Sequence, residues 1–382
     1  MTDHIALCRA AGVAVTAIPA AHQPEVLVGF DGFVDNIIDV VQQRVTNSEY
    51  TPFPTIASLG ERISAAAGRS ANLELVIKQS KLGGNGPIMA NALCAQAHQV
   101  TVVGVLGDGA LDPVFQELGR RAAKVISLGT PSVTDALEFT DGKVMLGKLQ
   151  PMEKVTWTTL LAKAGGLEGV KTLFRTATGI ATVNWTMTLG LTEIWRRLAT
   201  EVLPGLRSDR PRWFIDLADP AKRTRGDILE ALAALGQLQR HVDIVLGLNE
   251  AECRQILDVL DVPWSAQANE WDAAAEACQA LQQRLGLSHV MCHLVRSAAV
   301  AWAATPARPA GAIGSNGFFE AKPLITTGAG DHFNAGFMGA LLAGLEPVHC
   351  LLVGGATSGH YVRTAVSPSR AQVAEFLASY RA

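Results

Sequence analysis

The chain has 382 residues, of which 48% are hydrophobic and 18% are charged, and its formal net charge at pH 7 is −3. This composition supports a large buried core, and the absence of a basic stripe excludes a typical nucleic-acid-binding protein. The six cysteines are scattered and form no C-x-x-C pair, which indicates reduced thiols in a cytoplasmic protein. No stretch is long and apolar enough to predict a membrane span.

Short apolar runs alternate with helical patterns along the chain. Strands are predicted at residues 26–30, 99–105, 213–217, 244–246 and 289–293. Helices are predicted at residues 86–96, 112–123, 189–198, 227–238, 251–260, 272–285, 331–343 and 370–379. This alternation predicts a mostly parallel sheet covered by helices on both faces. Ligands of such sheets bind beyond the carboxyl ends of the strands.

Two regions interrupt the alternation, at about residues 34–45 and 132–149. Both have the pattern of amphipathic strands, and we expect them to form a small sheet outside the main layer, a lid. The stretch between them at about 46–82 contains prolines, glycines and one helical pattern, and we interpret it as an insertion near the site. Residues 305–317 are predicted to form a surface loop. All 382 residues are expected to belong to one α/β domain.

A run of six residues ending at Asp331 reads Thr-Thr-Gly-Ala-Gly-Asp and opens a predicted helix. Free backbone N–H groups at a helix start bind anions, so Gly328, Ala329 and Gly330 are expected to bind a phosphate. Asp331 would then act as the general base for an attacking hydroxyl, ionised because the helix start lowers its pKa. The alternative is an ordinary turn before a helix, which explains the glycines but not the acid that follows them.

Candidate substrate ligands follow the first predicted strand and precede the second predicted helix. The carboxylates of Asp31 and Asp35 are suited to accept hydrogen bonds from sugar hydroxyls, although a local turn bond is the alternative for each. Gly84 would let the backbone approach the substrate closely, and the amide of Asn85 would bind a hydroxyl. Asn85 also fits a helix N-cap, and both roles are compatible.

Asn249 and Glu252 stand between a predicted strand and the helix that follows it. Their spacing matches a capping box, in which each side chain accepts a hydrogen bond from the other residue's backbone. It also matches a site in which Glu252 binds Mg²⁺ indirectly, through water. Asp216 and Asp219 follow another strand, where they would either order the site or form a turn before Pro220.

The order of these motifs resembles that of the ribokinase-like (PfkB) family of sugar and nucleoside kinases, over about residues 26–380. The matching segments are GFDGFVD at 29–35, LGGNGP at 82–87, VGVLGD at 103–108, NEAE at 249–252 and TTGAGDHFNAG at 326–336. The last motif is specific, and the others gain weight from their order. Two positions depart from the family. Ile325 replaces an aspartate, and residues 292–298 lack the glycines of the turn on the nucleotide side.

The resemblance implies a three-layer α/β sandwich with a small β lid. It implies an ATP-dependent kinase that phosphorylates a hydroxyl of a small sugar-like substrate with Mg²⁺, and it allows a monovalent cation. It assigns Asn249, Glu252 and Thr327 to the nucleotide side of the site. The partners expected are the sugar and the nucleotide, with neither nucleic acid nor membrane, and the lid offers a surface for a homodimer.

Other functions remain open at this point. A nucleoside kinase of the same family is one, and a non-catalytic sugar-binding regulator on this scaffold is another, since Ile325 and the missing glycines both depart from the family. A dinucleotide-dependent oxidoreductase is the third. It is suggested by Gly107-x-Gly109 after a strand, but Asp112 occupies the place of the third glycine of that fingerprint.

Overall fold

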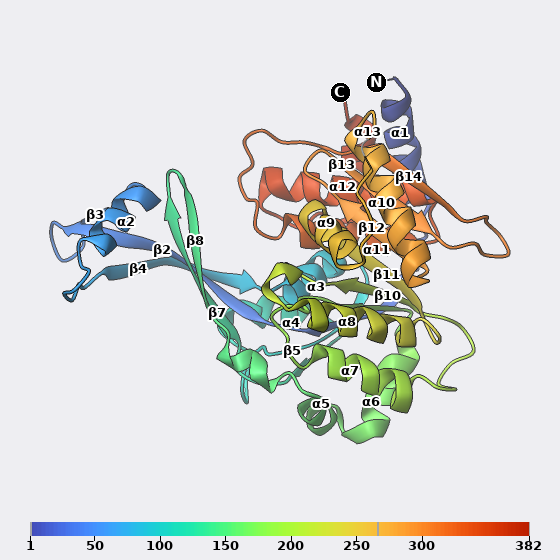
Figure 1. Cartoon of the computed structure of the whole chain (residues 1–382), viewed down its shortest axis with the longest axis horizontal. Coiled ribbons are helices and arrows are strands. Elements are labelled where there is room, and N and C mark those ends of the chain that lie inside the picture. Colours follow the sequence, from blue (N-terminus) through green and yellow to red (C-terminus); the bar gives the residue numbers. More distant parts are fainter. Residues whose placement is uncertain (1, 266, 382) are drawn as a thin grey trace.

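The computed structural model describes residues 2–265 and 267–381, and a nine-stranded sheet forms its centre (Figure 1). The order of the strands is β14-β13-β12-β11-β10-β9-β1-β5-β6. Neighbouring strands from β12 to β6 run parallel, whereas β13 and β14 are antiparallel additions at one edge. The bounds of the strands are β1 (Glu25–Phe30), β5 (Gln99–Gly104), β6 (Lys124–Ser127), β9 (Gly179–Thr182), β10 (Arg212–Asp216), β11 (Asp243–Asn249), β12 (His289–His293), β13 (Ser297–Trp302) and β14 (Gly311–Asn316).

Helices cover both faces of this sheet, and each face has its own hydrophobic core. One core is closed by α1 (Thr2–Thr16), α3 (Asn85–Ala95), α4 (Gln116–Arg121), α11 (Ala329–Leu342), α12 (Pro347–Thr364) and α13 (Arg370–Ser379). The other is closed by α5 (Trp157–Ala164), α6 (Gly166–Thr176), α7 (Leu191–Arg197), α8 (Arg225–Leu238), α9 (Glu250–Val259) and α10 (Glu270–Leu285). Short 3₁₀ turns cover Pro113–Phe115, Gln150–Lys154 and Pro220–Lys222, and a π-helical turn covers Leu198–Val202. The predicted three-layer arrangement is confirmed.

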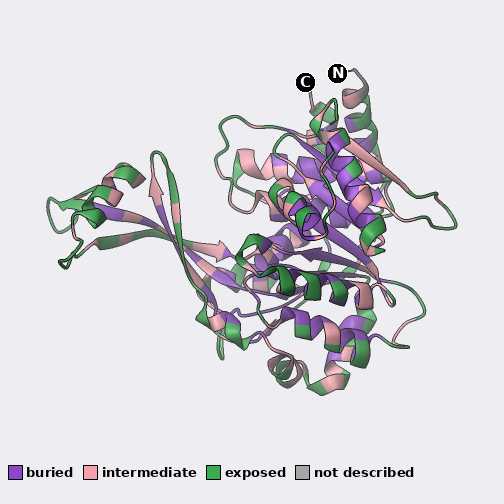
Figure 2. Ribbon diagram, in the orientation of Figure 1, coloured by how far each residue is buried: buried purple, intermediate pink, exposed green. Residues whose placement is uncertain are grey.

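The lid is a second, five-stranded sheet that extends away from the main body (Figure 1). It consists of β2 (Phe33–Arg44), β3 (Tyr50–Pro52), β4 (Glu74–Gly83), β7 (Ser132–Phe139) and β8 (Gly142–Lys148), with α2 (Ile56–Ser64) packed on it. Much of its surface is exposed, in contrast to the buried central sheet (Figure 2). Because β4 pairs with β2 along most of its length, the stretch at 46–82 is part of the lid sheet.

Two of the differences from the sequence-based expectation lie in the carboxyl-terminal part of the fold. The loop expected at 305–317 contains β14, whose pattern Gly-Ala-Ile-Gly-Ser-Asn has few strand-forming residues. Helix α12 was not predicted because its glycines lower helix propensity. Those glycines serve close packing, since a Cβ on Gly354 would lie 3.0 Å from the carbonyl oxygen of Phe333 on α11. Among the described residues, no helix has the length and apolar character needed to cross a membrane.

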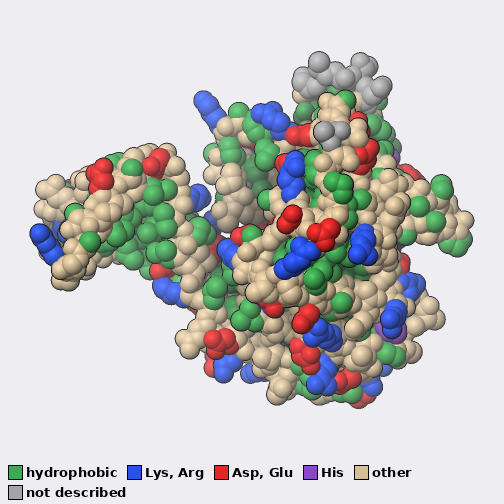
Figure 3. All heavy atoms as spheres, in the orientation of Figure 1, with side chains coloured by type: hydrophobic (Ala, Val, Ile, Leu, Met, Phe, Trp, Pro, Cys, Tyr) green, Lys and Arg blue, Asp and Glu red, His purple; other side chains and the backbone are tan. Residues whose placement is uncertain are grey.

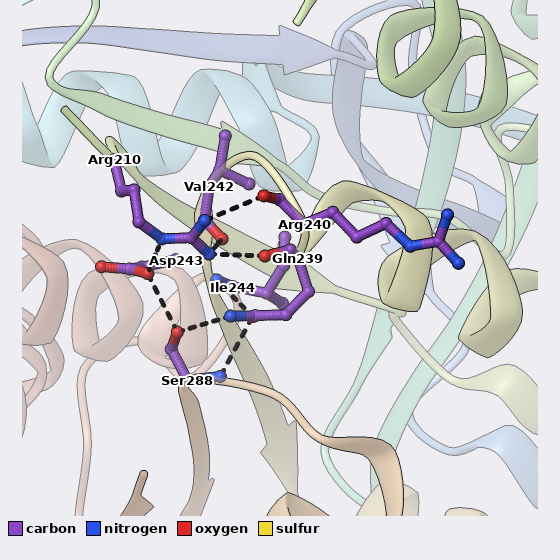
Figure 4. A network of polar contacts seen from close by, with 7 residues as sticks. All are labelled: Arg210, Gln239, Arg240, Val242, Asp243, Ile244 and Ser288. Carbon is purple, nitrogen blue, oxygen red and sulfur yellow. Dashed lines mark hydrogen bonds and ion pairs between the residues drawn. The ribbon is translucent and has the colours of Figure 1, made fainter. Parts of the chain in front are cut away.

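The amino-terminal edge of the sheet is held together by a polar network (Figure 4). The guanidinium of Arg210 donates to Oδ1 of Asp243 at 2.8 Å, which joins the starts of β10 and β11. Oε1 of Gln239 accepts from the backbone N–H groups of Ile244 and Ser288, both at 3.0 Å. These contacts tie together the amino-terminal ends of β10, β11 and β12. The carboxyl-terminal ends of the strands, at the opposite edge, are where ligands of parallel sheets bind.

Beneath that opposite edge, two buried indoles share one acceptor. Nε1 of Trp195 and Nε1 of Trp213 each donate to Oγ1 of Thr182 at 2.9 Å. Nε1 of a third buried indole, Trp185, donates to Oγ1 of Thr192 at 2.8 Å. All three indoles are fully buried. An unpaired donor here would have no access to water.

We predict that Thr182→Val destabilises the protein about twice as much as Thr192→Val. Valine has the shape of threonine without the acceptor, so the first change strands two buried N–H groups and the second strands one. Each stranded group costs about 1–3 kcal/mol, so we expect a loss of roughly 2–6 kcal/mol for Thr182→Val. Urea unfolding of both variants measures the difference. Equal losses would contradict the shared-acceptor account.

Candidate active site

The carboxyl ends of the parallel strands bring together residues that are far apart in the sequence. Asn85 begins α3, and its Nδ2 donates to Oδ1 of Asp331 at 2.9 Å. Asp331 lies in the first turn of α11, as the glycine motif predicts. Two of the predicted site residues therefore contact each other across 246 positions of the chain.

The expectation of a low pKa for Asp331 is wrong in this structure. Its side chain is buried, with an exposed fraction of 8%, and burial raises its pKa to about 8. The carboxylates of Asp31 and Glu252 raise this pKa further, whereas the hydrogen bond from Asn85 lowers it. Desolvation outweighs the positive end of the helix because Asp331 is packed beneath the site and not at its surface.

The turn before α11 offers backbone donors, as the glycines predict. Gly328 adopts the left-handed conformation at φ 88°, which explains the need for glycine at this point. The N–H of Ala329 donates to the carbonyl of Thr326 at 3.1 Å, so it is engaged within the turn. The N–H groups of Gly328 and Gly330 donate to no acceptor among the described residues, which leaves them available to an anion.

The carboxylate of Asp31 is surrounded by protein donors. Its Oδ1 accepts from the N–H of Gly86 at 2.8 Å, and its Oδ2 accepts from the N–H of Asn85 at 2.9 Å and from Nδ2 of Asn184 at 2.8 Å. A Cβ on Gly86 would lie 2.5 Å from Oδ1, so the close approach requires glycine. Asp31 thus fixes the start of α3 and, through it, Asn85. Direct contact between Asp31 and a substrate stays a prediction.

Asp35 lies in β2 at the base of the lid, flanked by Lys81 of β4 and Thr134 of β7. Burial raises its pKa, while Lys81 and Thr134 favour the charged form. A Cβ on Gly83 would lie 2.4 Å from its Cγ, which accounts for glycine there. Gly84 adopts a φ of 91° between this residue and α3. Asp35 therefore stands where the lid joins the body.

Asn249 and Glu252 form the predicted capping box at the start of α9. The N–H of Glu252 donates to Oδ1 of Asn249 at 3.0 Å, and the N–H of Asn249 donates to Oε2 of Glu252 at 2.9 Å. Oε1 of Glu252 accepts from the N–H of Asp219 at 2.8 Å. Burial raises the pKa of Glu252. The described residues include no group of three His, Cys, Asp or Glu side chains placed to hold a metal ion.

Asp216 belongs to the same carboxylate group, at the end of β10. It accepts from the N–H of Ala218 and from Nδ2 of Asn334, both at 2.8 Å. Burial and the nearby charges of Glu252 and Asp331 raise its pKa well above the ordinary value. Asn334 and the Asn184 that holds Asp31 were not predicted as site residues. Asn334 does lie within the motif at 326–336, three residues after Asp331 on the same helix face, whereas Asn184 has no such signal.

A cavity of about 650 Å³ opens beside the start of α11. Its wall is formed by the start of α9, the end of β12, α12 and the turn before α11. The lining residues used below are Asn249, Arg254, His293, Thr326, Ala329 and Gly330. Thr326 lines the cavity in place of the predicted Thr327, whose carbonyl accepts from the hydroxyl of Tyr361 at 3.1 Å. The volume is suited to a small organic ligand.

Comparison with known proteins identifies relatives over almost the whole chain. The family model described as prokaryotic ketohexokinase matches residues 4–380. A ketohexokinase from Haloferax volcanii is 29% identical over 363 residues, which cover 93% of this chain and 91% of the relative.

Solved structures show the same fold at low sequence identity. A ribokinase from Arabidopsis thaliana, complexed with ribose and ATP, has a TM-score of 0.59 and 17% identity, and the match covers 94% of this chain and 99% of that one. A nucleoside kinase of the ribokinase family from Methanocaldococcus jannaschii has a TM-score of 0.56 and 13% identity, with the same shares covered. The predicted ribokinase-like fold is confirmed.

We predict that kcat/KM for phosphoryl transfer rises with pH and levels off above about 8. Because burial raises the pKa of Asp331, its carboxyl is protonated and inactive as a base in the free protein below that pH. Asn85→Leu removes a hydrogen bond that favours the charged form, so we expect the rise to move to higher pH. Asn91→Leu, on the same helix, is the matched control. A rise near pH 4 in the wild type, or no shift in Asn85→Leu, would contradict this account.

Proposed function

The chain belongs to the prokaryotic ketohexokinase family, and from that premise we propose that it transfers the γ-phosphoryl group of ATP to a hydroxyl of a ketohexose. Membership makes the chain a carbohydrate kinase, a phosphotransferase with an alcohol group as acceptor. The ketohexose is proposed from the family and from the Haloferax volcanii relative. The residues assigned below are proposed from their geometry in this chain.

The single observation that carries the catalytic assignment is the contact between Asn85 and Asp331 beside the unengaged N–H of Gly330. Asp331 accepts the proton of the attacking hydroxyl. The N–H groups of Gly328 and Gly330 donate to the oxygens of the transferred phosphoryl group as negative charge moves onto them. Base and anion donors lie within one turn of a helix, which places the hydroxyl and the phosphoryl group next to each other.

We assign the sugar to the side of Asp35, at the junction of lid and body. Its carboxylate accepts hydrogen bonds from sugar hydroxyls, and Lys81 helps to keep it charged. Gly84 leaves space for the sugar to approach the backbone. Asn85 has one amide hydrogen engaged by Asp331, and its carbonyl oxygen remains as an acceptor for a substrate hydroxyl.

The nucleotide is assigned to the cavity beside α11, which Asn249 and Thr326 line, with Glu252 capped by Asn249 at the start of α9. Both oxygens of Glu252 already accept a backbone N–H, so the donor set fits Mg²⁺ held through water better than direct ligation. When bound, Mg²⁺ neutralises the phosphate charge. The monovalent cation stays a prediction without a residue assigned to it.

We predict that Asp331→Asn lowers kcat at least 100-fold, the usual effect of losing a general base. Asparagine has the same shape, so nucleotide binding and folding are expected to persist. Transfer is measured with ATP and Mg²⁺ by ADP release, and the product is identified by ³¹P NMR, over ketohexoses, aldohexoses and nucleosides. Thermal shift with ATP verifies that the variant is folded and binds.

Two outcomes would contradict the proposal. Equal turnover of Asp331→Asn and the wild type would remove Asp331 as the base. Preference for a nucleoside or an aldohexose over every ketohexose would remove the substrate assignment while leaving the kinase chemistry in place.

The lid is also proposed as the contact of a homodimer. Its exposed side chains include Leu75 (46%), Ile77 (56%) and Leu146 (48%), which the strand register puts on one face, and hydrophobic side chains gather on the face of the lid seen in Figure 3. Clustered exposed apolar surface of this kind marks contact sites in proteins. A second copy of the chain is the occupant we favour, because two copies of one apolar sheet face complement each other about a two-fold axis.

We predict that the wild type is a dimer and that the double variant Ile77→Lys, Leu146→Lys is a monomer, measured by light scattering coupled to size exclusion. Two charges in an apolar contact are expected to abolish it, because each would be desolvated without a partner. Leu229→Lys on α8, where leucine is 41% exposed outside the lid, is the matched control. A monomeric wild type would contradict the proposal.

A further inference from the structure

The turn after β12 differs from the glycine-rich turn that the family resemblance leads one to expect, and His293 is the residue that ends the strand. In parallel register His293 pairs with Asn249, the last residue of β11. Both residues line the cavity assigned to the nucleotide. The imidazole is therefore the aromatic, hydrogen-bonding side chain that β12 presents at the active edge of the sheet.

The edge of the His293 ring faces the start of α11. A Cβ built on Gly330 would lie 3.3 Å from Cε1 and 3.4 Å from Nε2 of His293. Such contacts are tighter than ordinary van der Waals packing, so the ring approaches Gly330 closely because glycine has no side chain. Nε2 is thereby placed beside the backbone N–H that we assign to the phosphate.

The imidazole has no hydrogen-bonding partner in the part of the chain that the structure describes. The face of the ring packs on Phe333, with ring centroids 5.3 Å apart and planes at 36°. Burial lowers its pKa to about 4, so the ring is neutral near pH 7 and carries one N–H donor. His293 is only partly buried and lines the cavity, so this N–H is accessible to a ligand there, and a ligand that accepts from it would gain a hydrogen bond.

Arg254, a cation that lines the cavity, is already engaged by other residues. By contrast, the N–H of His293, which has no acceptor among the described residues, is available to a phosphate there. The guanidinium of Arg254 donates to Oε1 of Glu250 at 2.8 Å and lies over the ring of Trp264 at 3.8 Å. A phosphate chain in the cavity would thus meet neutral N–H donors near α11. A metal site at His293 is not supported, since the described residues contain no suitable group of three ligating side chains.

We propose that Nε2–H of His293 donates a hydrogen bond to the phosphate chain of the bound nucleotide, next to the N–H of Gly330. This inference rests on the proposed kinase function and adds a residue to its phosphate site. The side chain of His293 supplies a donor that a glycine-rich turn would supply from its backbone. The proton stays on the imidazole throughout, so no bond to hydrogen is broken in this contact.

Calorimetric binding of ATP, ADP and AMP to three variants tests the contact. His293→Phe keeps the packing on Phe333 and removes the donor, whereas His293→Gln restores an N–H at similar reach. We expect His293→Phe to bind ATP and ADP about tenfold more weakly, the worth of one hydrogen bond, with AMP changed far less. His293→Gln should lie within about threefold of the wild type for all three nucleotides.

His289→Phe is the matched control, because His289 lies at the other end of β12 and burial lowers its pKa in the same way. It should leave binding of all three nucleotides unchanged. Should His293→Phe fail to fold, His293→Leu takes its place with the same expected result. The KM for the sugar should remain that of the wild type in every His293 variant.

Three results would overturn the inference: wild-type ATP binding by His293→Phe, equal weakening of AMP and ATP, or His293→Gln no better than His293→Phe. Failure of the proposed function is distinguishable, because it would appear as absence of transfer to any sugar by the wild type. The binding comparison among nucleotides would still report on the contact of His293.

Discussion

The active edge of this protein depends on the carboxylate of Asp31. This carboxylate accepts three hydrogen bonds. Two come from the successive backbone N–H groups of Asn85 and Gly86 at the start of α3, and one comes from Nδ2 of Asn184 after β9. Through them a strand, a helix and a loop are fixed to one another at a single buried charge. Asn85 takes its place from this junction, and Asp331 takes its hydrogen bond from Asn85. The contact between Asn85 and Asp331, on which the proposed catalytic site depends, is therefore positioned by a carboxylate whose oxygens already accept three protein donors.

The same region concentrates negative charge without a matching internal cation. Burial raises the pKa of Asp31, Asp216, Glu252 and Asp331, and among the described residues none of these four carboxylates forms an ion pair with a lysine or arginine. Like charges this close favour partial protonation in the free protein. The positive charge of a bound Mg²⁺ would favour their ionised forms, so binding of the cation and ionisation of the proposed base Asp331 would be coupled in this arrangement.

The sequence was sufficient to predict those features of the fold that depend only on residues close together in the chain. The glycine turn, the helix beginning near Asp331 and the capping box at Asn249 each follow from residues within one turn of each other. The pKa of Asp331 does not, because burial depends on contacts with Asn85, far away in the chain. Strand β9 was missed for a similar reason, since four small and apolar residues become a strand only between β1 and β10. The contact between His293 and Gly330 likewise exists only in three dimensions.

Strand β2 connects the base of the lid to its tip without interruption. Its twelve residues from Phe33 to Arg44 span about 40 Å, and Asp35 is the third of them. When a rigid strand rotates about its attached end, the displacement of each residue grows with its distance from that end. A pivot at the attached end would therefore displace Arg44 at the tip far more than Asp35 at the base. Opening of the lid for exchange of ligands would be mechanically compatible with the sugar-binding role that we propose for Asp35, since its carboxylate would stay in position.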